Sequence, residues 1–240
     1  MTRSSDIAPA LGNMIEGWVQ PAVPVGDTLS GTFAVLEPLC ADAHAATLFD
    51  HYAGHDQVWD YMPYGPFGSA DAYAAWIKET VARPEHLFYA IRNLETGTWE
   101  GVASYLRINP AAGSIEVGHI CMSPALQRTR AATEAMFLMM QWAFEAGYRR
   151  YEWKCNAGNL ASRGAAQRYG FSFEGVFRQA AVIKGRNRDT AWFAAIDSEW
   201  PALRAAFQTW LSPDNFVEGA QIARLSDLTA PILVSHDPAL

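Results

Sequence analysis

Hydrophobic and polar positions along the chain switch repeatedly between the two-residue period of strands and the three- to four-residue period of helices. Strand patterns cover residues 32–36, 87–92, 99–108, 114–122, 149–155, 171–183 and 188–196. Helix patterns cover 41–53, a segment capped at 69–71 that runs to 81, a segment that opens at Arg128 and ends at Gly147, 160–169 and 199–211. The chain therefore alternates strands and helices without an internal repeat.

The connections between these elements predict the topology of the sheet. Residues 87–122 form three strand patterns joined by the short stretches NLETGT and NPAAG, which indicates an antiparallel meander. The strand at 114–122, the following helix and the strand at 149–155 require a right-handed parallel crossover. We expect an α+β fold with a mixed, mostly antiparallel sheet and a central parallel crossover.

The two ends of the chain lack sustained periodicity. Residues 1–30 contain Pro21, Pro24 and Gly26, and residues 213–240 contain Pro213, Pro231 and Pro238. We predict one domain at 31–212, an extended or wrapping N-terminal segment at 1–30, and a C-terminal tail at 213–240. Such segments could wrap a partner subunit in a homodimer.

Composition narrows the classes of function. The formal net charge of −7 and the pI near 5.3 argue against a nucleic-acid binder, which needs a basic face, and favour a cationic substrate such as an amine. The sequence has neither a continuous apolar leader segment nor an apolar run of membrane-spanning length. We expect a cytoplasmic protein without a membrane partner.

Cysteine and histidine spacing suggests neither a disulfide framework nor a metal site. Cys40, Cys121 and Cys155 are an odd number without a CxxC pair. His51 and His55 have a metal-compatible spacing, but no HExxH pattern accompanies them, and an exposed helix end explains them better. We expect no metal.

The helix after the crossover strand has an unusual start, SPALQRTRAATEAM. Helix N-termini favour acidic residues, yet this one opens with Arg128 and Arg130 and carries its acid, Glu134, later. The free N–H groups and the arginines together predict an anion site. The alternative is a solvated cationic turn that pairs with nearby acids.

A second polar stretch, CNAGNLASRGAAQRYGF, follows the next strand. On residue type alone, Asn156 ends the strand, Asn159 caps the next helix, and Ser162 is a polar residue of its first turn.

Together the order of elements and these two stretches resemble the GCN5-related N-acetyltransferase (GNAT) family, in particular its ribosomal-protein branch, over about residues 30–212. The stretch from Gln127 to Ala132 is similar to the family motif Q/R-x-x-G-x-G/A, with Arg130 in place of the glycine. The arginine could weaken the match, or strengthen binding by pairing with phosphate. The resemblance implies that the pyrophosphate of acetyl-CoA binds at Gln127, Arg128, Thr129, Arg130, Ala131 and Ala132.

The resemblance also implies roles along the two strands. Asn156 and Asn159 match asparagines that contact the pantetheine arm or order its loop, and Ser162 matches a residue that returns a proton to the leaving thiolate. Cys121 and Met122 lie on the strand edge that pantetheine follows, and a backbone N–H near Met122 would stabilise the oxyanion.

The general base departs from the pattern of that branch. Where the branch can place a glutamate, this chain has Ala181. Glu116 and His119 are our substitutes, acting directly or through water, with Asp189 as a weaker candidate. Strand alternation puts Glu116 and His119 on opposite faces, so we expect only one of them to line the cleft. Either residue could instead be structural.

The stretch WDYMPYGPF stands where the family builds its acceptor pocket. Trp59, Tyr61, Tyr64 and Phe67 could form a substrate wall, which we favour, or an aromatic plug of the core.

These features predict an N-acetyltransferase that transfers an acetyl group from acetyl-CoA to a primary amine, on a protein N-terminus or a small molecule. The amine would attack directly in a ternary complex, without metal or covalent enzyme intermediate. One alternative is a degenerate CoA-binding sensor or interaction module, and another is an unrelated α+β protein.

Overall fold

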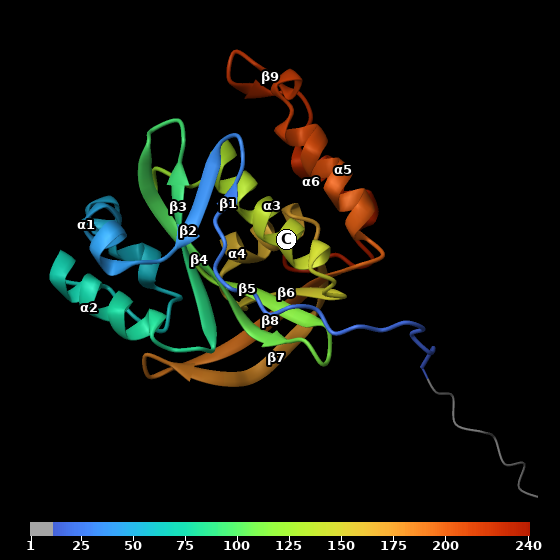
Figure 1. Ribbon diagram of the computed structural model, residues 1–240, viewed down its shortest axis with the longest axis horizontal. Coiled ribbons are helices and arrows are strands. Elements are labelled where there is room, and N and C mark those ends of the chain that lie inside the picture. The colour runs from blue at the N-terminus through green and yellow to red at the C-terminus, as the bar shows by residue number, and fades with distance from the viewer. Residues whose placement is uncertain (1–11) are drawn as a thin grey trace, which may run out of the picture.

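The computed structural model describes residues 12–240 and contains an eight-stranded sheet (Figure 1). Its order is β1 (Leu29–Ser30), β2 (Ala34–Pro38), β3 (His86–Asn93), β4 (Thr98–Asn109), β5 (Ser114–Met122), β6 (Arg150–Asn156), β8 (Arg186–Ile196) and β7 (Ser172–Ile183). Neighbouring strands are antiparallel except β5 and β6. The expected mixed α+β fold with one parallel crossover is confirmed.

Helices cover both faces of the sheet (Figure 1). The helices α1 (Ala41–Tyr52) and α2 (Ala70–Val81) bury one cluster of apolar residues, and α3 (Arg130–Glu145), α4 (Leu160–Arg168) and α5 (Trp200–Leu211) bury the larger one on the opposite face. Each cluster joins helix side chains spaced three or four apart to alternate strand residues, as amphipathic elements require.

The parallel strands β5 and β6 separate along their length. They pair in register from Ser114 opposite Arg150 to Val117 opposite Trp153. Beyond that point β5 continues to Met122 alongside β4, whereas β6 continues to Asn156 alongside β8. Because each strand follows a different neighbour, a wedge opens between their carboxyl ends.

Glu134 of α3 fixes the first turn of the sheet. Its buried carboxylate accepts hydrogen bonds from the backbone N–H groups of Thr32, Phe33 and Ala34 at 2.9, 2.5 and 2.7 Å. A side chain at Gly31 would meet this carboxylate at 2.3 Å, so the turn requires glycine there. Glu134, the first acidic residue of α3, therefore binds the β1–β2 turn and does not face the solvent at the start of the helix.

The segments that flank the sheet pack against it. Tyr148 donates a hydrogen bond to the Ala22 carbonyl at 3.0 Å, and Arg149 lies over the Trp18 ring. The prediction for 1–30 also concerns residues 1–11, which lie outside the described residues. Residues 213–240 contain a short hairpin, β9 (Phe216–Val217) with β10 (Ala220–Gln221), and a short helix, α6 (Leu225–Thr229).

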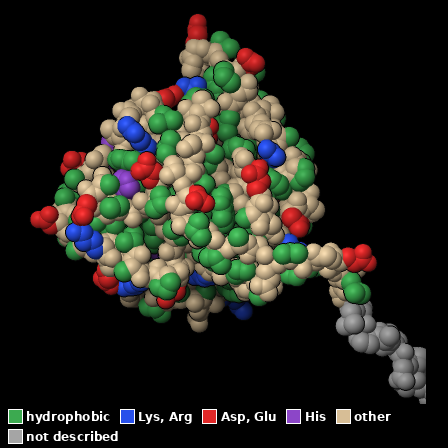
Figure 2. Space-filling view, viewed as in Figure 1, with side chains coloured by type: hydrophobic (Ala, Val, Ile, Leu, Met, Phe, Trp, Pro, Cys, Tyr) green, Lys and Arg blue, Asp and Glu red, His purple; other side chains and the backbone are tan. Residues whose placement is uncertain are grey.

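The surface of the described chain is mixed in charge. Figure 2 shows a face on which acidic and basic side chains are interspersed among uncharged ones. Within residues 12–240, no helix is both long enough and apolar enough to cross a membrane.

Candidate active site

A bulge in β5 brings Glu116 and His119 to the same face of the sheet. Cys121 pairs with Val102 but Gly118 pairs with Ser104, so β5 contains an extra residue at this point, and His119 takes a left-handed φ of 50°. The extra residue shifts the alternation of side chains. The expectation that only one of Glu116 and His119 lines the cleft is therefore wrong, because both line one cavity.

This cavity has a volume of about 430 Å³ and lies where β5 and β6 separate. Its walls come from the loop after residue 60, from β4 to β8 and from α4. Among the residues singled out from the sequence it is lined by Tyr61, Glu116, His119, Asn156, Asn159, Ser162 and Ala181. Ala181 lies on β7.

Glu116 is the carboxylate of this cavity and is only 2% exposed. Arg107 donates to its Oε1 at 2.6 Å, and Lys154 Nζ forms an ion pair with its Oε2 at 2.8 Å. Burial raises the pKa of Glu116, although the two cations oppose the shift. The raised pKa makes Glu116 a stronger base than an ordinary carboxylate.

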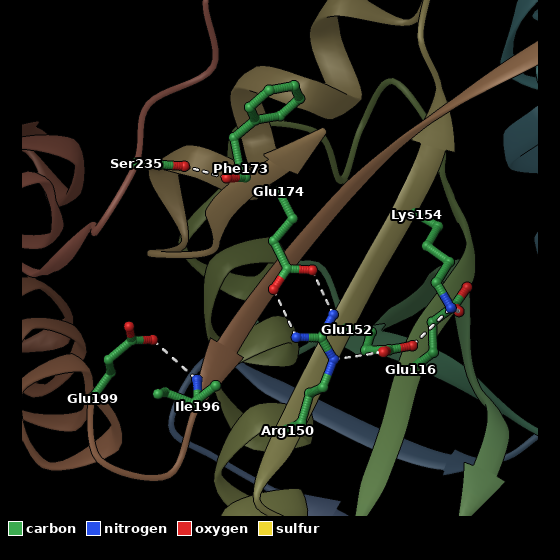
Figure 3. A network of polar contacts seen from close by, with 9 residues as sticks. All are labelled: Glu116, Arg150, Glu152, Lys154, Phe173, Glu174, Ile196, Glu199 and Ser235. Carbon is green, nitrogen blue, oxygen red and sulfur yellow. Dashed lines mark hydrogen bonds and ion pairs between the residues drawn. The ribbon is translucent and has the colours of Figure 1, made fainter. Parts of the chain in front are cut away.

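A line of charges connects Glu116 to the surface (Figure 3). Lys154 also pairs with Glu152 at 2.7 Å, and Arg150 joins Glu152 at 2.6 Å to Glu174 of β7. Glu152 lies directly opposite Glu116 in the parallel register, so Lys154 stands between two carboxylates. This shared cation separates their like charges.

His119 is a neutral imidazole at physiological pH. Its Nδ1 lies 3.2 Å from the Tyr64 hydroxyl, and the two rings stack with centroids 5.6 Å apart. Burial, together with the proximity of His86 and the nearby positive charge of Arg107, lowers the pKa of His119 to about 4. His119 can exchange a hydrogen bond but is a weak base.

The depressed pKa of His119 predicts acid sensitivity of the fold. The unfolded chain binds this proton near pH 6.5 but the folded chain only near pH 4, so stability falls as the pH drops from 6.5 to 4. We expect His119→Gln to flatten the decline of Tm over this range. Calorimetric scans should show the wild-type decline in the control His51→Gln, and an unchanged slope in His119→Gln would contradict the assignment.

Ser162, Asn156 and Asn159 have local structural partners and also line the cavity. Asn156 Oδ1 accepts from Gly158 N at 2.8 Å, and Asn159 Oδ1 caps α4 by accepting from Ser162 N at 3.1 Å. The Ser162 hydroxyl accepts from the Trp153 indole at 3.0 Å. Its oxygen accepts this bond, so the hydroxyl can also act as a hydrogen-bond donor.

The start of α3 presents unsatisfied backbone donors. Thr129 caps the helix by accepting from Ala132 N at 3.1 Å, and Arg128 takes a left-handed φ of 64°. Within the described chain, the N–H groups of Arg128, Arg130 and Ala131 have no acceptor. Gln127 donates to the Met122 carbonyl at 3.0 Å and so ties this loop to the end of β5.

The side chain of Arg130 turns away from this helix start. It pairs with Glu95, and its guanidinium lies 4.5 Å from the Phe33 ring centroid and 5.1 Å from that of Phe216. Its backbone is not left-handed, so an arginine fits where the family motif has glycine.

The comparisons with known proteins agree with this geometry. The acetyltransferase (GNAT) domain family matches residues 34–172. The chain belongs to the GNAT acetyltransferases. This family transfers acetyl groups from acetyl-CoA.

Two solved structures resemble this GNAT acetyltransferase over most of its length. A GCN5-related N-acetyltransferase from Brucella melitensis is 41% identical, with 90% of this chain and 100% of that chain covered and a TM-score of 0.87. A probable GNAT acetyltransferase from Chromobacterium violaceum is 44% identical, with 83% and 100% covered and a TM-score of 0.76. No curated protein matches.

The ribosomal-protein branch is a distant structural neighbour. The RimL ribosomal alpha-N-protein acetyltransferase is 20% identical, with 75% of this chain and 99% of that chain covered and a TM-score of 0.61. This likeness shows the fold of the GNAT acetyltransferase alone.

Some residues of the aromatic loop pack in the core of the acetyltransferase, and others lie at the cavity. Trp59 is 3% exposed and packs edge-on against Phe67 and Tyr73, and neither Trp59 nor Phe67 lines the cavity, so their place in a substrate wall stays a prediction. They fill the space between α1 and α2. Tyr61 lines the cavity and donates a hydrogen bond to the Gly158 carbonyl at 3.2 Å. Tyr64 does not line the cavity, but its hydroxyl contacts His119, which does.

The buried cysteines of the acetyltransferase are not poised as nucleophiles. Burial raises the pKa of the Cys121 thiol to about 12 and also raises that of Cys155. Asp189 lies outside the cavity, where it accepts hydrogen bonds from Gln179 and Asn187. The described residues contain no cluster of three His, Cys, Asp or Glu side chains that could hold a metal ion.

Four residues that line the cavity were not predicted from the sequence: Arg107, Lys154, Arg188 and Trp192. One signal in β6 could have indicated Lys154. Arg150, Glu152 and Lys154 alternate with Tyr151 and Trp153 there, which marks a polar face on a central strand.

Proposed function

We propose that this GNAT acetyltransferase transfers an acetyl group from acetyl-CoA to a primary amine by direct attack in a ternary complex. The observation that carries this proposal is the shared cavity of Glu116 and Ser162, which come from β5 and α4 and meet where β5 and β6 separate. A base and an acid are thus available on the walls of one site.

The described residues fit acetyl-CoA as the acyl donor. The unsatisfied N–H groups at the start of α3 and the exposed Arg128 suit a pyrophosphate. Asn156 and Asn159 line the cavity that leads away from the end of β5 and would hold the pantetheine arm. Bound acetyl-CoA supplies the activated acyl carbon and a thiolate leaving group.

Glu116 is the proposed general base. The carboxylate takes a proton from the substrate ammonium, directly or through water, and the neutral amine then forms the new N–C bond as the C–S bond breaks. Ser162 donates its hydroxyl proton to the leaving sulfur, and the second proton that the nitrogen loses as the amide forms restores the Ser162 hydroxyl. His119, with its pKa near 4, serves as a neutral hydrogen-bonding group beside them.

A CoA-binding sensor or interaction module is the second candidate function. Arg130 in place of the motif glycine and Ala181 in place of the expected acid favour it. This alternative predicts acetyl-CoA binding without turnover. For the transferase, a protein N-terminus, as in the RimL-like branch, and a small amine are both proposed acceptors.

Replacing Ser162 by Ala tests the proposed acid. We expect kcat to fall by about 10²-fold or more, because the leaving thiolate loses its proton donor. The Kd for acetyl-CoA, measured by calorimetric titration, should stay within a few-fold. The exposed Ser198→Ala is the control. Equal losses in kcat and binding would show that Ser162 only supports the loop, and binding without transfer in the wild type would favour the sensor.

A further inference from the structure

One wall of the cavity carries hydrogen-bond donors that lack acceptors. Arg188, Thr190 and Trp192 project from alternate positions of β8 and line it. Within the described chain, the side chain of Arg188 makes no hydrogen bond or ion pair, and its buried Nε has no acceptor. The buried indole N–H of Trp192 also has none. Unsatisfied buried donors are costly, so each needs an explanation.

Positive charge collects around Arg188 in a protein of net charge −7. A second cavity of about 480 Å³ shares Arg188 and Tyr61 with the first, and Lys184 and Arg186 line it against a single acid, Asp60. Burial lowers the pKa of the Arg188 guanidinium, which reflects the cost of holding this charge out of water.

The other cations of the main cavity already have carboxylate partners. Arg107 pairs with Glu116, and Lys154 pairs with both Glu116 and Glu152. Arg188 is the cation on these walls that pairs with no carboxylate among residues 12–240. An anionic group of a bound ligand would supply the missing partner of Arg188.

Glu116 and Arg188 give the cavity two opposite charges on different strands. Glu116 on β5 contributes a carboxylate to the cavity wall, which can attract an ammonium group, and Arg188 on β8 contributes a guanidinium, which can attract an anion. Phe177 and Trp192, stacked with centroids 4.4 Å apart, add an apolar surface to the same cavity. A cavity of about 430 Å³ suits a small molecule.

We infer that the acceptor is a small amine that also carries a carboxylate or phosphate group, with its ammonium at Glu116 and its anionic group at Arg188. This inference rests on the proposed acetyltransferase function and names the substrate class of the same site. The indole N–H of Trp192 is the second donor to the anionic oxygens, and Arg188 is a specificity-determining residue.

Matched pairs of amines test the inference in the full-length chain with acetyl-CoA. Phenylalanine against phenylethylamine isolates a carboxylate, and phosphoethanolamine against ethanolamine isolates a phosphate. We expect the anionic member of at least one pair to have a kcat/KM about 10²-fold higher, because its absence leaves Arg188 unpaired. The two pairs distinguish a carboxylate from a phosphate ligand.

Variants of Arg188 test whether this residue supplies the discrimination. We expect Arg188→Gln to abolish the preference by raising KM for the anionic member, while the neutral amine and the Kd for acetyl-CoA change little. Arg188→Lys should recover part of the preference because it restores the charge. Arg204→Gln is the control, since Arg204 pairs with Glu145 on the far helices α5 and α3.

Each outcome has a distinct meaning. Transfer to both members of each pair at similar kcat/KM, or efficient transfer only to peptide N-termini, overturns the inference but supports the acetyltransferase. A loss of acetyl-CoA affinity in Arg188→Gln also overturns it, because the arginine would then serve the cofactor. Without any transfer, calorimetric titration of the CoA complex with the same pairs still decides whether the anionic member binds preferentially.

Discussion

Replacing Glu116 by Gln is expected to lower kcat by about 10²–10⁴-fold, the usual contribution of a general base. The amide keeps the shape of the side chain but cannot take the proton of an ammonium group. Because burial raises the pKa of Glu116, wild-type kcat should fall as the pH drops through that raised value. The residual activity of Glu116→Gln should lack this acid limb in a pH–rate profile.

Glu152→Gln is the matched control for this variant. Glu152 lies opposite Glu116 in the parallel register and shares Lys154 with it, but does not line the cavity. The control therefore changes the same ion network without removing the proposed base. An equal loss of activity in both variants would mean that Glu116 acts only through the ion network. If Glu116→Gln kept the kcat of the wild type, Glu116 would not be the general base, and His119 or solvent would take the proton instead.

Replacing Asp237 by Ala is expected to destabilise the protein by about 3–5 kcal/mol, because it leaves the Arg163 guanidinium buried without its partner. Arg163 Nε donates to Asp237 Oδ2 at 2.6 Å, and its Nη2 donates to Oδ1. Both side chains are buried. The Tm should fall by roughly 6–20 °C in a chain of this size, as measured by scanning calorimetry.

The same variant should also weaken acetyl-CoA binding, because Arg163 holds the loop before α4. Its Nη1 donates to the Ala157 carbonyl at 2.7 Å, between Asn156 and Asn159. Asp227→Ala, in the exposed part of α6, is the control. The double change Arg163→Met/Asp237→Leu should restore stability, since it leaves no charge unpaired. A loss below about 1 kcal/mol in Asp237→Ala would mean that the pair is solvated.

Local periodicity was sufficient to predict the main helices and strands of the sheet. The strand at Ser114–Met122 matches β5, and the helix patterns ending near Tyr52 and Leu211 match α1 and α5 within a few residues. These elements bury one regular face each, so their pattern is visible in the sequence. The short elements after residue 212 lack such a pattern.

The site depended on features that have no local signal. The bulge that brings Glu116 and His119 together arises from pairing with β4, and no residue type announces it. The partners of Glu116, Arg107 and Lys154, come from neighbouring strands that are distant along the chain. Composition likewise could not decide that Trp59 belongs to the core, because aromatic residues suit both a pocket and a plug.

The bond between Arg163 and Asp237 also has a consequence for synthesis of the protein. The two residues are 74 positions apart, so a translating ribosome makes Asp237 roughly 4–15 s after Arg163 at about 5–20 residues/s. From Ile196 onward, in the later part of that interval, the nascent chain contains the complete sheet sequence but not the anchor of the loop before α4. Nascent chains interrupted before Asp237 should therefore be captured by chaperones and proteases more readily than finished ones.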